Sequence, residues 1–430
     1  MYLIRQTPLF SCEEFFAERD DNSRLLLVLQ ALPDEKLVGW LQGQRGKARD
    51  DYPWLMLWRC LLARYVYQIR TDAELIRELH RNGSLRWLVG IASPEGVPRD
   101  YHFSRLRAHL SQAQGLALLD ELFAGLVDLL RELLPQLGRH LAVDGTAVHA
   151  YSNEERKVKS DPDAAWSARP KGQRRKNDSG QVERRLEYWF GYVVHLVVDC
   201  DTELPVAYEV TPANVSETTR FAPLLQELQQ EHPEVVARTA VVTADAGYDS
   251  TENCKLVLQD LQAVPIIKMR LTLPREAICQ AEVALCNELG TPLCLSGHKM
   301  KYWGRDGDYL KWRCPVACGD KKIKCTMRGR CSGSKYGRVL KISLWENPRR
   351  WPGLARESKK WLRLYKHRTA VERVNARLKD YLQLDQLTVR GLAKVKVHTG
   401  MGLLVMLAGA LAVAQQGRVA EIRQTVRLAA

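Results

Sequence analysis

The sequence predicts an α/β protein: a mixed β-sheet with flanking helices, preceded by an all-α region and interrupted by a β-rich, cysteine-containing insertion. Apolar residues recur at helical spacing through residues 1–138. From residue 139 the pattern predicts three strands, a helix and a fourth strand, which is typical of a mixed sheet. Residues 255–348 contain dispersed cysteines, glycines and lysines among short β-like segments, and helical spacing returns from Glu357.

These changes of pattern predict five segments. They are a helical N-terminal domain at 1–138, the first part of the α/β domain at 139–254, the insertion at 255–348, the second part of the α/β domain at 349–415 and a C-terminal tail at 416–430. Residues 153–187 are polar and charged, and we expect them to form a mobile loop between the first two strands.

The composition indicates a soluble, folded protein with a polyanionic partner. Hydrophobic residues make up 46% and charged residues 27% of the 430 residues, which excludes an intrinsically disordered chain. The 64 Lys and Arg residues exceed the 50 Asp and Glu residues, so the formal net charge is +14. This excess favours nucleic acid over a membrane surface as the partner.

No segment predicts export or a membrane anchor, so we expect a cytoplasmic protein. The first residues lack the basic, apolar and small-residue regions of a secretory signal. Residues 397–417 carry no charged side chain but include two polar pairs, His398-Thr399 and Gln415-Gln416. About fifteen apolar residues remain there, whereas a membrane span needs about 20. A buried helix is the expected structure.

The helical N-terminal region has two candidate roles. Its helices are indicated by an apolar stripe and by a capping box that Thr71 forms with Glu74. After a turn rich in proline and glycine, a short helix carries four basic side chains: His102, Arg105, Arg107 and His109. This helix is a candidate for DNA binding, and a plain helical bundle with solvated arginines explains the same pattern.

Two aspartates follow buried strands of the predicted sheet. Asp144 follows the apolar run 141–143, Asp245 follows the run 241–244, and a glycine comes shortly after each. Two acids at the ends of strands in one sheet can lie close enough to share cations. Each aspartate alone is a weak signal, because an aspartate in such a position often caps the next turn.

A third carboxylate lies on a predicted helix with an unusual set of neighbours. The residues Tyr365, Arg368, Glu372 and Lys379 are spaced by three, four and seven, so their side chains share one face. A neighbouring apolar stripe packs this helix on the sheet in our prediction; it consists of Val371, Val374, Leu378 and Leu382. A surface ion-pair ladder between Arg368 and Glu372 is the structural alternative.

Together these residues resemble the signature of DDE transposases from bacterial insertion sequences. The matching elements are Asp144, then Asp245 with the Ala-Gly-Tyr that follows it, and finally Tyr365-x2-Arg368-x3-Glu372-x6-Lys379. The resemblance covers residues 139–415 and extends more loosely to the N-terminal region. That region is similar to the DNA-binding domain that these enzymes commonly have.

The resemblance implies a ribonuclease H-like catalytic domain. In such a domain Asp144 ends the first strand, Asp245 follows the fourth, and Glu372 comes from a helix after an insertion. The family's three carboxylates bind two Mg²⁺ ions, with Mn²⁺ as a substitute. Carboxylate oxygens are the ligands that these hard cations prefer.

The implied activity is that of a DNA endonuclease and strand transferase. Hydrolysis at the transposon end frees a 3′-hydroxyl, which then attacks target DNA. The implied partners are double-stranded DNA, both transposon ends and target, and a second protomer, because joining two ends requires at least a homodimer in the active complex. By the motif, Arg368 and Lys379 contact phosphates beside the scissile bond, and Tyr365 hydrogen-bonds or packs there.

The insertion carries a candidate zinc site. Seven of the 11 cysteines fall within residues 279–331, and disulfides are not expected in a chain without an export signal. Four of them are separated by four, seven and six residues: Cys314, Cys318, Cys325 and Cys331. Cys294-x3-His298 precedes them. Four thiolates, or a mixture with histidine, suit tetrahedral Zn²⁺, and free buried cysteines are the alternative.

Two other functions fit part of the pattern. A domesticated or inactive transposase-derived protein would only bind DNA, and cleavage of the flanking terminal repeats distinguishes it from an active enzyme. A metal-dependent nuclease unrelated to transposition shares the carboxylates but not the helix motif. Inverted repeats beside the gene separate that nuclease from a transposase.

Overall fold

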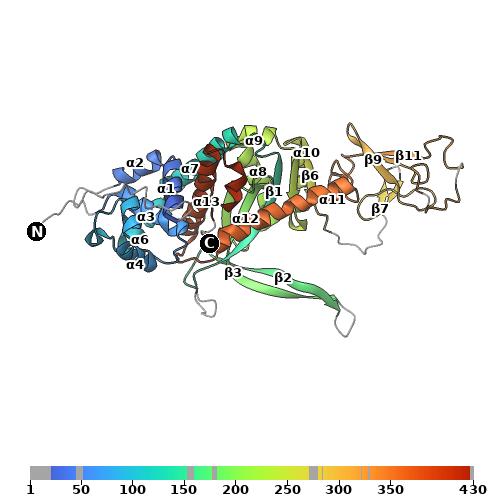
Figure 1. Ribbon diagram of the computed structural model, residues 1–430. Coiled ribbons are helices and arrows are strands. Elements are labelled where there is room, and N and C mark those ends of the chain that lie inside the picture. Colours follow the sequence, from blue (N-terminus) through green and yellow to red (C-terminus); the bar gives the residue numbers. More distant parts are fainter. Residues whose placement is uncertain are drawn as a thin grey trace, which may run out of the picture.

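The computed structural model describes residues 21–44, 52–152, 159–176, 182–270, 279–282, 284–320, 322–327 and 330–426. The molecule is elongated, with the N-terminal helices at one end, the main sheet in the middle and the insertion at the other end (Figure 1). The expected combination of helices with a mixed sheet is confirmed.

Helices form every element that the structure describes between Asp21 and Leu133. They are α1 (Asp21–Ala31), α2 (Glu35–Gly43), α3 (Trp54–Val66), α4 (Asp72–Arg81), α5 (Gly83–Val89), the 3-10 turn η2 (Pro94–Gly96), α6 (Asp100–Leu110) and α7 (Ala113–Leu133). The predicted capping box begins α4. The Glu74 N–H donates to Thr71 Oγ1 and the Thr71 N–H donates to Glu74 Oε2, both at 3.1 Å.

The basic side chains of α6 mostly face the interior of the helical bundle. His102 is buried, Arg107 pairs with Asp72, and the ring of His109 lies 5.1 Å from that of Trp54. Of the four basic residues in the predicted DNA-binding helix, only Arg105 is exposed. Three of these four side chains therefore pack within the bundle and do not form a basic surface.

One mixed sheet of six strands forms the middle of the molecule. Its order is β2-β3-β1-β5-β6, and β4 also pairs with β3. β1 runs parallel to β5, and β5 runs parallel to β6, whereas β3 is antiparallel to both β1 and β4. The strands are β1 (His140–His149), β2 (Ala165–Lys176), β3 (Val182–Asp199), β4 (Pro205–Pro212), β5 (Val241–Ala244) and β6 (Val264–Ile267).

The prediction of a mobile loop over residues 153–187 is wrong where the structure describes β2 and the first part of β3. These strands pair antiparallel and project from the sheet as a long hairpin (Figure 1). Charged residues conceal the strands in the sequence because they pair across the hairpin: Arg169 Nε donates to Glu187 Oε2 at 3.0 Å. Residues 153–158 and 177–181 of the predicted loop lie outside the described residues.

Helices cover the sheet and connect it to the insertion. After β4 come α8 (Glu217–Glu231) and α9 (Pro233–Ala237), and after β5 come the 3-10 turn η3 (Ala246–Tyr248) and α10 (Thr251–Gln259). The insertion contains β7 (Cys279–Ala281), β8 (Ala284–Cys286), β9 (Lys301–Asp306), β10 (Tyr309–Arg313) and β11 (Val339–Ser343). The chain returns through α11 (Lys359–Tyr365), the 3-10 turn η4 (Lys366–Arg368) and α12 (Thr369–Asp380).

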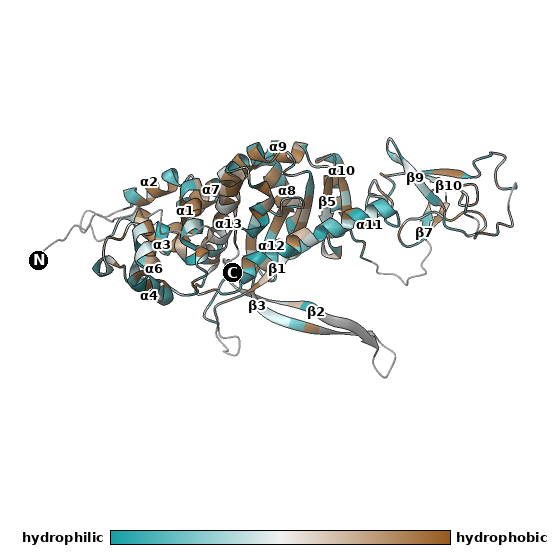
Figure 2. Cartoon of the chain, viewed as in Figure 1, coloured by the Kyte–Doolittle hydropathy of each residue, from teal (hydrophilic) through white to brown (hydrophobic). Residues whose placement is uncertain are grey.

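The apolar segment near the C-terminus forms α13 (Leu392–Gln415), which lies in the core. By length and composition this helix could cross a membrane, but residues 397–414 are all buried inside the protein. Figure 2 shows the helix between the N-terminal helices and the main sheet. It packs against α7, α1 and β4. The segment predicted as a tail then turns back on this core through η5 (Val419–Gln424), where Ile422 is buried.

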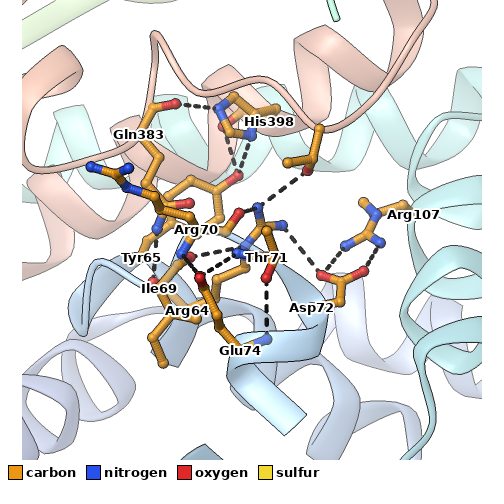
Figure 3. A network of polar contacts seen from close by, with 11 residues as sticks. Arg64, Tyr65, Ile69, Arg70, Thr71, Asp72, Glu74, Arg107, Gln383 and His398 are labelled. Carbon is orange, nitrogen blue, oxygen red and sulfur yellow. Dashed lines mark hydrogen bonds and ion pairs between the residues drawn. The ribbon is translucent and has the colours of Figure 1, made fainter. Parts of the chain in front are cut away.

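A buried polar network joins the N-terminal helices to the chain that follows α12 (Figure 3). The Arg64 guanidinium, 2% exposed, donates to the carbonyls of Ile69 and Arg70 and pairs with Asp72. On the other side, Gln383 Nε2 donates to the Arg64 carbonyl at 2.9 Å. This network fixes the loop between α12 and α13 against α3.

Replacing Arg64 with methionine is expected to lower the free energy of unfolding by about 3 kcal/mol, because buried carbonyls lose a charged donor and Asp72 loses one of its two arginines. Urea unfolding measures this change. The exposed Arg105 provides the matched control, and Arg105→Met should change stability by less than about 0.5 kcal/mol. Equal effects of the two substitutions would contradict the role of the network.

His398 makes the stability of this interface depend on pH. Its Nε2 donates to the Gln383 carbonyl at 2.9 Å and its Nδ1 lies 2.9 Å from the Tyr65 hydroxyl. Burial lowers the pKa of His398 from 6.5 to about 4. Between these values the unfolded chain binds a proton that the folded chain does not, so stability decreases as the pH falls.

The substitution His398→Gln is expected to reduce this loss of stability by about 1.5 kcal/mol between pH 6.5 and 5. Urea unfolding at several pH values measures the effect, with His80→Gln on the exposed face of α4 as the control. Parallel pH profiles for the wild type and His398→Gln would show that His398 does not stay neutral in the folded chain.

Candidate active site

Parallel pairing of β1 with β5 places the two predicted aspartates next to each other. The last residue pair between these strands is Val143 with Ala244, and Asp144 and Asp245 come directly after it. Paired strands lie about 4.8 Å apart, so the two carboxylates share one position at the end of the parallel ladder. Their electrostatic interaction follows from this placement.

The expectation that Asp144 ends its strand is wrong. β1 continues to His149, and Asp144 is still paired with Leu196 of β3. It lies where β1 loses β5 as a neighbour, because β5 ends at Ala244 and Asp245 begins a turn. Asp245 Oδ1 accepts a hydrogen bond from the Gly247 N–H at 2.6 Å, so this aspartate caps the turn as well as facing Asp144.

The third predicted acid, Glu372, is connected to Asp144 by Arg368, which pairs with both. Arg368 Nη2 donates to Glu372 Oε1 at 2.5 Å, and Arg368 Nη1 lies 3.7 Å from Asp144 Oδ2. The side chain of Glu372 is 48% exposed and that of Asp144 is 18% exposed. The predicted ion-pair ladder therefore exists, but it extends to the aspartate of the sheet.

The other two residues of the helix motif lie in different surroundings. Tyr365 borders the acids: its ring stacks on Trp361 with 5.0 Å between centroids, and the Arg368 guanidinium lies 5.9 Å from the tyrosine centroid. Lys379 binds β1, donating to the Ala147 carbonyl at 2.7 Å, and it also pairs with Asp385. In this state Lys379 holds the strand of Asp144 rather than the acid itself.

A fourth carboxylate, which our sequence analysis missed, lies beside the two aspartates. Glu217 begins α8, directly after β4. A Cβ atom added to Gly145 would lie 2.9 Å from Glu217 Oε1, and one added to Gly247 would lie 3.3 Å from Glu217 Oε2. The glycines that follow the two aspartates thus leave the space that this carboxylate fills.

The sequence contains a signal for Glu217, but it requires the topology to be recognised. β4 is antiparallel to β3, which is antiparallel to β1, so β4 and β1 run in the same direction. Asp144, within β1, therefore meets the acids that follow β4 and β5 where the parallel pairing of β1 with β5 ends. Glu217 lies in the first helical turn after the third predicted strand, so this topology would have predicted that it joins the two aspartates.

Burial and mutual repulsion shape the electrostatics of these acids. Burial, followed by the charge of Asp245, raises the pKa of Asp144 to about 7, and Arg368 opposes this shift. Burial, followed by Asp144 and Asp245, raises the pKa of Glu217 to about 7. The carboxylates are only partly neutralised by the arginine, and their all-oxygen donor set is the kind that binds Mg²⁺ or Mn²⁺.

A second group with metal-ligand chemistry lies at the start of β1. Within the described residues, His140, Asp201 and His367 place potential ligand atoms within 4.8 Å of one another. His140 Nδ1 is 3.1 Å from Asp201 Oδ2, and the rings of the two histidines are 5.1 Å apart. Two imidazoles with one carboxylate are donors typical of Zn²⁺ rather than Mg²⁺.

The cysteines predicted to bind zinc do not form such a group in the part of the insertion that the structure describes. The Cys318 N–H donates to the Cys314 carbonyl at 3.1 Å, so these two share a turn. Cys325 Sγ lies 3.5 Å from Ser296 Oγ, beside the turn from Cys294 to His298. A zinc ion in the insertion stays a prediction.

Comparison with known proteins gives two family matches. Residues 135–408 match the family described as Transposase DDE domain, and residues 13–109 match the family described as Transposase domain (DUF772). Among solved structures, the piggyBac transposase synaptic complex with hairpin DNA is similar, with 12% identity, a TM-score of 0.39 and coverage of 95% of this chain and 79% of that chain.

No curated protein matches the chain. The first family match spans more than half of the 430 residues and includes Asp144, Glu217, Asp245 and Glu372. The resemblance to insertion-sequence DDE transposases is thereby confirmed, and the chain belongs to the transposase DDE domain family.

Proposed function

We propose that the protein is an active insertion-sequence transposase. It binds terminal inverted repeats, cleaves DNA to free 3′-hydroxyls and joins them to target DNA. The observation that carries this proposal is the placement of Asp144 beside Asp245, together with the ion pairs of Arg368 with both Asp144 and Glu372. The core order β4-β3-β1-β5-β6, in which β3 alone runs against the other strands, supports a ribonuclease H-like catalytic domain.

In this proposal Asp144, Asp245 and Glu372 hold two Mg²⁺ ions, for which Mn²⁺ substitutes. When bound, such a pair activates the attacking oxygen and stabilises both the attacking and the leaving oxygen of an in-line phosphoryl transfer. The chain itself supplies orientation. Main-chain pairing fixes the two aspartates, and the buried Val371, Val374 and Leu378 fix the helix of Glu372 on the sheet.

The cations of the helix motif have separate tasks in the reaction. A guanidinium presents two parallel donors that match phosphate oxygens, so Arg368 exchanges its carboxylate partners for the DNA phosphate beside the scissile bond. Lys379 takes a neighbouring phosphate and keeps β1 in place through Ala147. Tyr365, stacked on Trp361, forms a rigid border to this position.

We assign a basic run in the sequence of the projecting hairpin to double-stranded DNA as well. Residues 169–176 on β2 form a basic run without an acid, and the hairpin carries it away from the sheet (Figure 1). A phosphate backbone binds such a run by releasing counterions. Because two transposon ends are joined, the active complex contains at least two protomers, and it acts on DNA in the cytoplasm.

The presence of every expected acid, with Arg368 and Lys379, favours an active enzyme over a domesticated copy that only binds DNA. The helix motif and the family match favour transposition over an unrelated metal-dependent nuclease. Cleavage of the element's own terminal repeats separates these three functions.

The substitutions Asp144→Asn, Asp245→Asn and Glu372→Gln are each expected to lower the rate of DNA cleavage by about 1000-fold or more, because several kcal/mol of transition-state stabilisation are lost. A gel assay with terminal-repeat DNA and Mg²⁺ measures cleavage, and a mobility shift on the same DNA should show binding close to that of the wild type. Asp260→Asn, at an exposed position after α10, is the control. Full cleavage by any one of the three variants would refute the assignment of that acid.

A zinc ion held by Cys314, Cys318, Cys325 and Cys331 is a separate proposal for the insertion. Protein purified without chelator is expected to contain close to one equivalent of zinc, and Cys314→Ser with Cys318→Ser should remove it. Elemental analysis measures the content. Zinc that disappears instead in His140→Ala with His367→Ala would assign the metal to the histidine group.

A further inference from the structure

We infer that Glu217 is a fourth carboxylate of the metal-binding site, which binds a divalent cation together with Asp144 and Asp245. This inference rests on the proposed function, because it assigns a further ligand to the same cation site. It adds a residue from α8, an element outside the two aspartate strands and the glutamate helix of the transposase motif.

The position of Glu217 is fixed by two glycines and by the hydrogen bonds of the next residue, Thr218. Its carboxylate lies next to Gly145 and Gly247, and a side chain at either glycine would meet it. The neighbouring Thr218 hydroxyl donates to the Gly247 carbonyl, and Asn253 Nδ2 bridges the carbonyls of Thr218 and Tyr248. The first turn of α8 is therefore attached to the turn that carries Asp245.

Other largely buried acids of this chain have partners inside the protein. Glu203 pairs with Arg373 and Arg377, and Asp72 pairs with Arg64 and Arg107. The side chain of Glu217 has no hydrogen bond or ion pair within the described residues, although two aspartates lie beside it. An acid placed among like charges without a cation destabilises the folded chain.

The position of Glu217 at the start of a helix does not remove this cost. A carboxylate in the first helical turn gains about 0.3–1 kcal/mol from the helix dipole. Repulsion by two neighbouring carboxylates in a partly buried site exceeds that gain. A cation bound by the group compensates the repulsion, and a purely structural role for Glu217 provides no such compensation.

The test is Mn²⁺ binding by the full chain without DNA. Electron paramagnetic resonance measures the concentration of free Mn²⁺ and so the amount that is bound. Mn²⁺ prefers oxygen ligands, so the cysteines of the insertion do not compete. Glu217→Gln is expected to weaken Mn²⁺ binding by about 10- to 100-fold. Glu217→Asp, which keeps a carboxylate, should recover part of the affinity, and Glu227→Gln on the exposed face of the same helix should bind like the wild type.

Thermal unfolding with and without Mn²⁺ gives the second readout. Glu217→Gln removes a repelling charge, so the melting temperature without Mn²⁺ should rise and the increase on adding Mn²⁺ should shrink. A merely structural Glu217 predicts a lower melting temperature with an unchanged Mn²⁺ effect, and that result would overturn the inference.

Asp144→Asn and Asp245→Asn separate this inference from the proposed function. If both weaken Mn²⁺ binding and Glu217→Gln does not, the metal site stands and Glu217 is not part of it. If none of the three substitutions changes Mn²⁺ binding, the proposed metal site itself is wrong, and the inference about Glu217 falls with it.

Discussion

Repulsion among carboxylates at one edge of the sheet is the constraint that the rest of this structure accommodates. β1, β4 and β5 run in the same direction, so backbone pairing brings Asp144, Glu217 and Asp245 together before any side-chain contact favours their meeting. Burial then raises the pKa of Asp144 and Glu217 to about 7, which is a cost to the folded state at neutral pH. Arg368 offsets part of the cost through Asp144 and Glu372. Packing elsewhere in the chain must offset the remaining electrostatic cost of these carboxylates, so that the folded state is stable without bound cations.

The contacts around α12 contribute to that stability. Glu203, in the turn before β4, accepts from Arg373 Nε at 2.7 Å and from Arg377 Nη2 at 3.2 Å, so it holds the helix of Glu372 to the sheet. The loop after α12 is fixed to α3 through Gln383 and Arg64, and α13 runs through the core beside it. The N-terminal helices are therefore part of the support for the active site.

The sequence predicted the parts of the site that depend on local pattern. Buried apolar runs followed by an acid identified Asp144 and Asp245, and helical spacing identified the face shared by Arg368 and Glu372, because both patterns follow directly from backbone geometry. What it missed depended on partners distant in the chain. The segment predicted as a loop contains a hairpin in which Arg169 pairs with Glu187 across the two strands. The direction of β4 places Glu217 beside the two aspartates. Lys379 lies on the predicted face, yet its amine reaches the Ala147 carbonyl, which spacing along a helix does not specify.

The acidic site lies in a chain whose formal net charge is +14. In the proposed function this contrast couples the binding of cations to the binding of DNA. In this structure Arg368 partly neutralises the two carboxylates of Glu372 and Asp144. A DNA phosphate that takes this guanidinium leaves the carboxylates without their cation, while the carboxylates repel the phosphate. In the proposed function, Asp144, Asp245 and Glu372 would hold divalent cations whose charge would oppose both effects, and Arg368 would then be available to the DNA phosphate. By linkage the coupling is reciprocal: DNA must increase the affinity of the acids for cations by the same factor by which the cations increase the affinity for DNA.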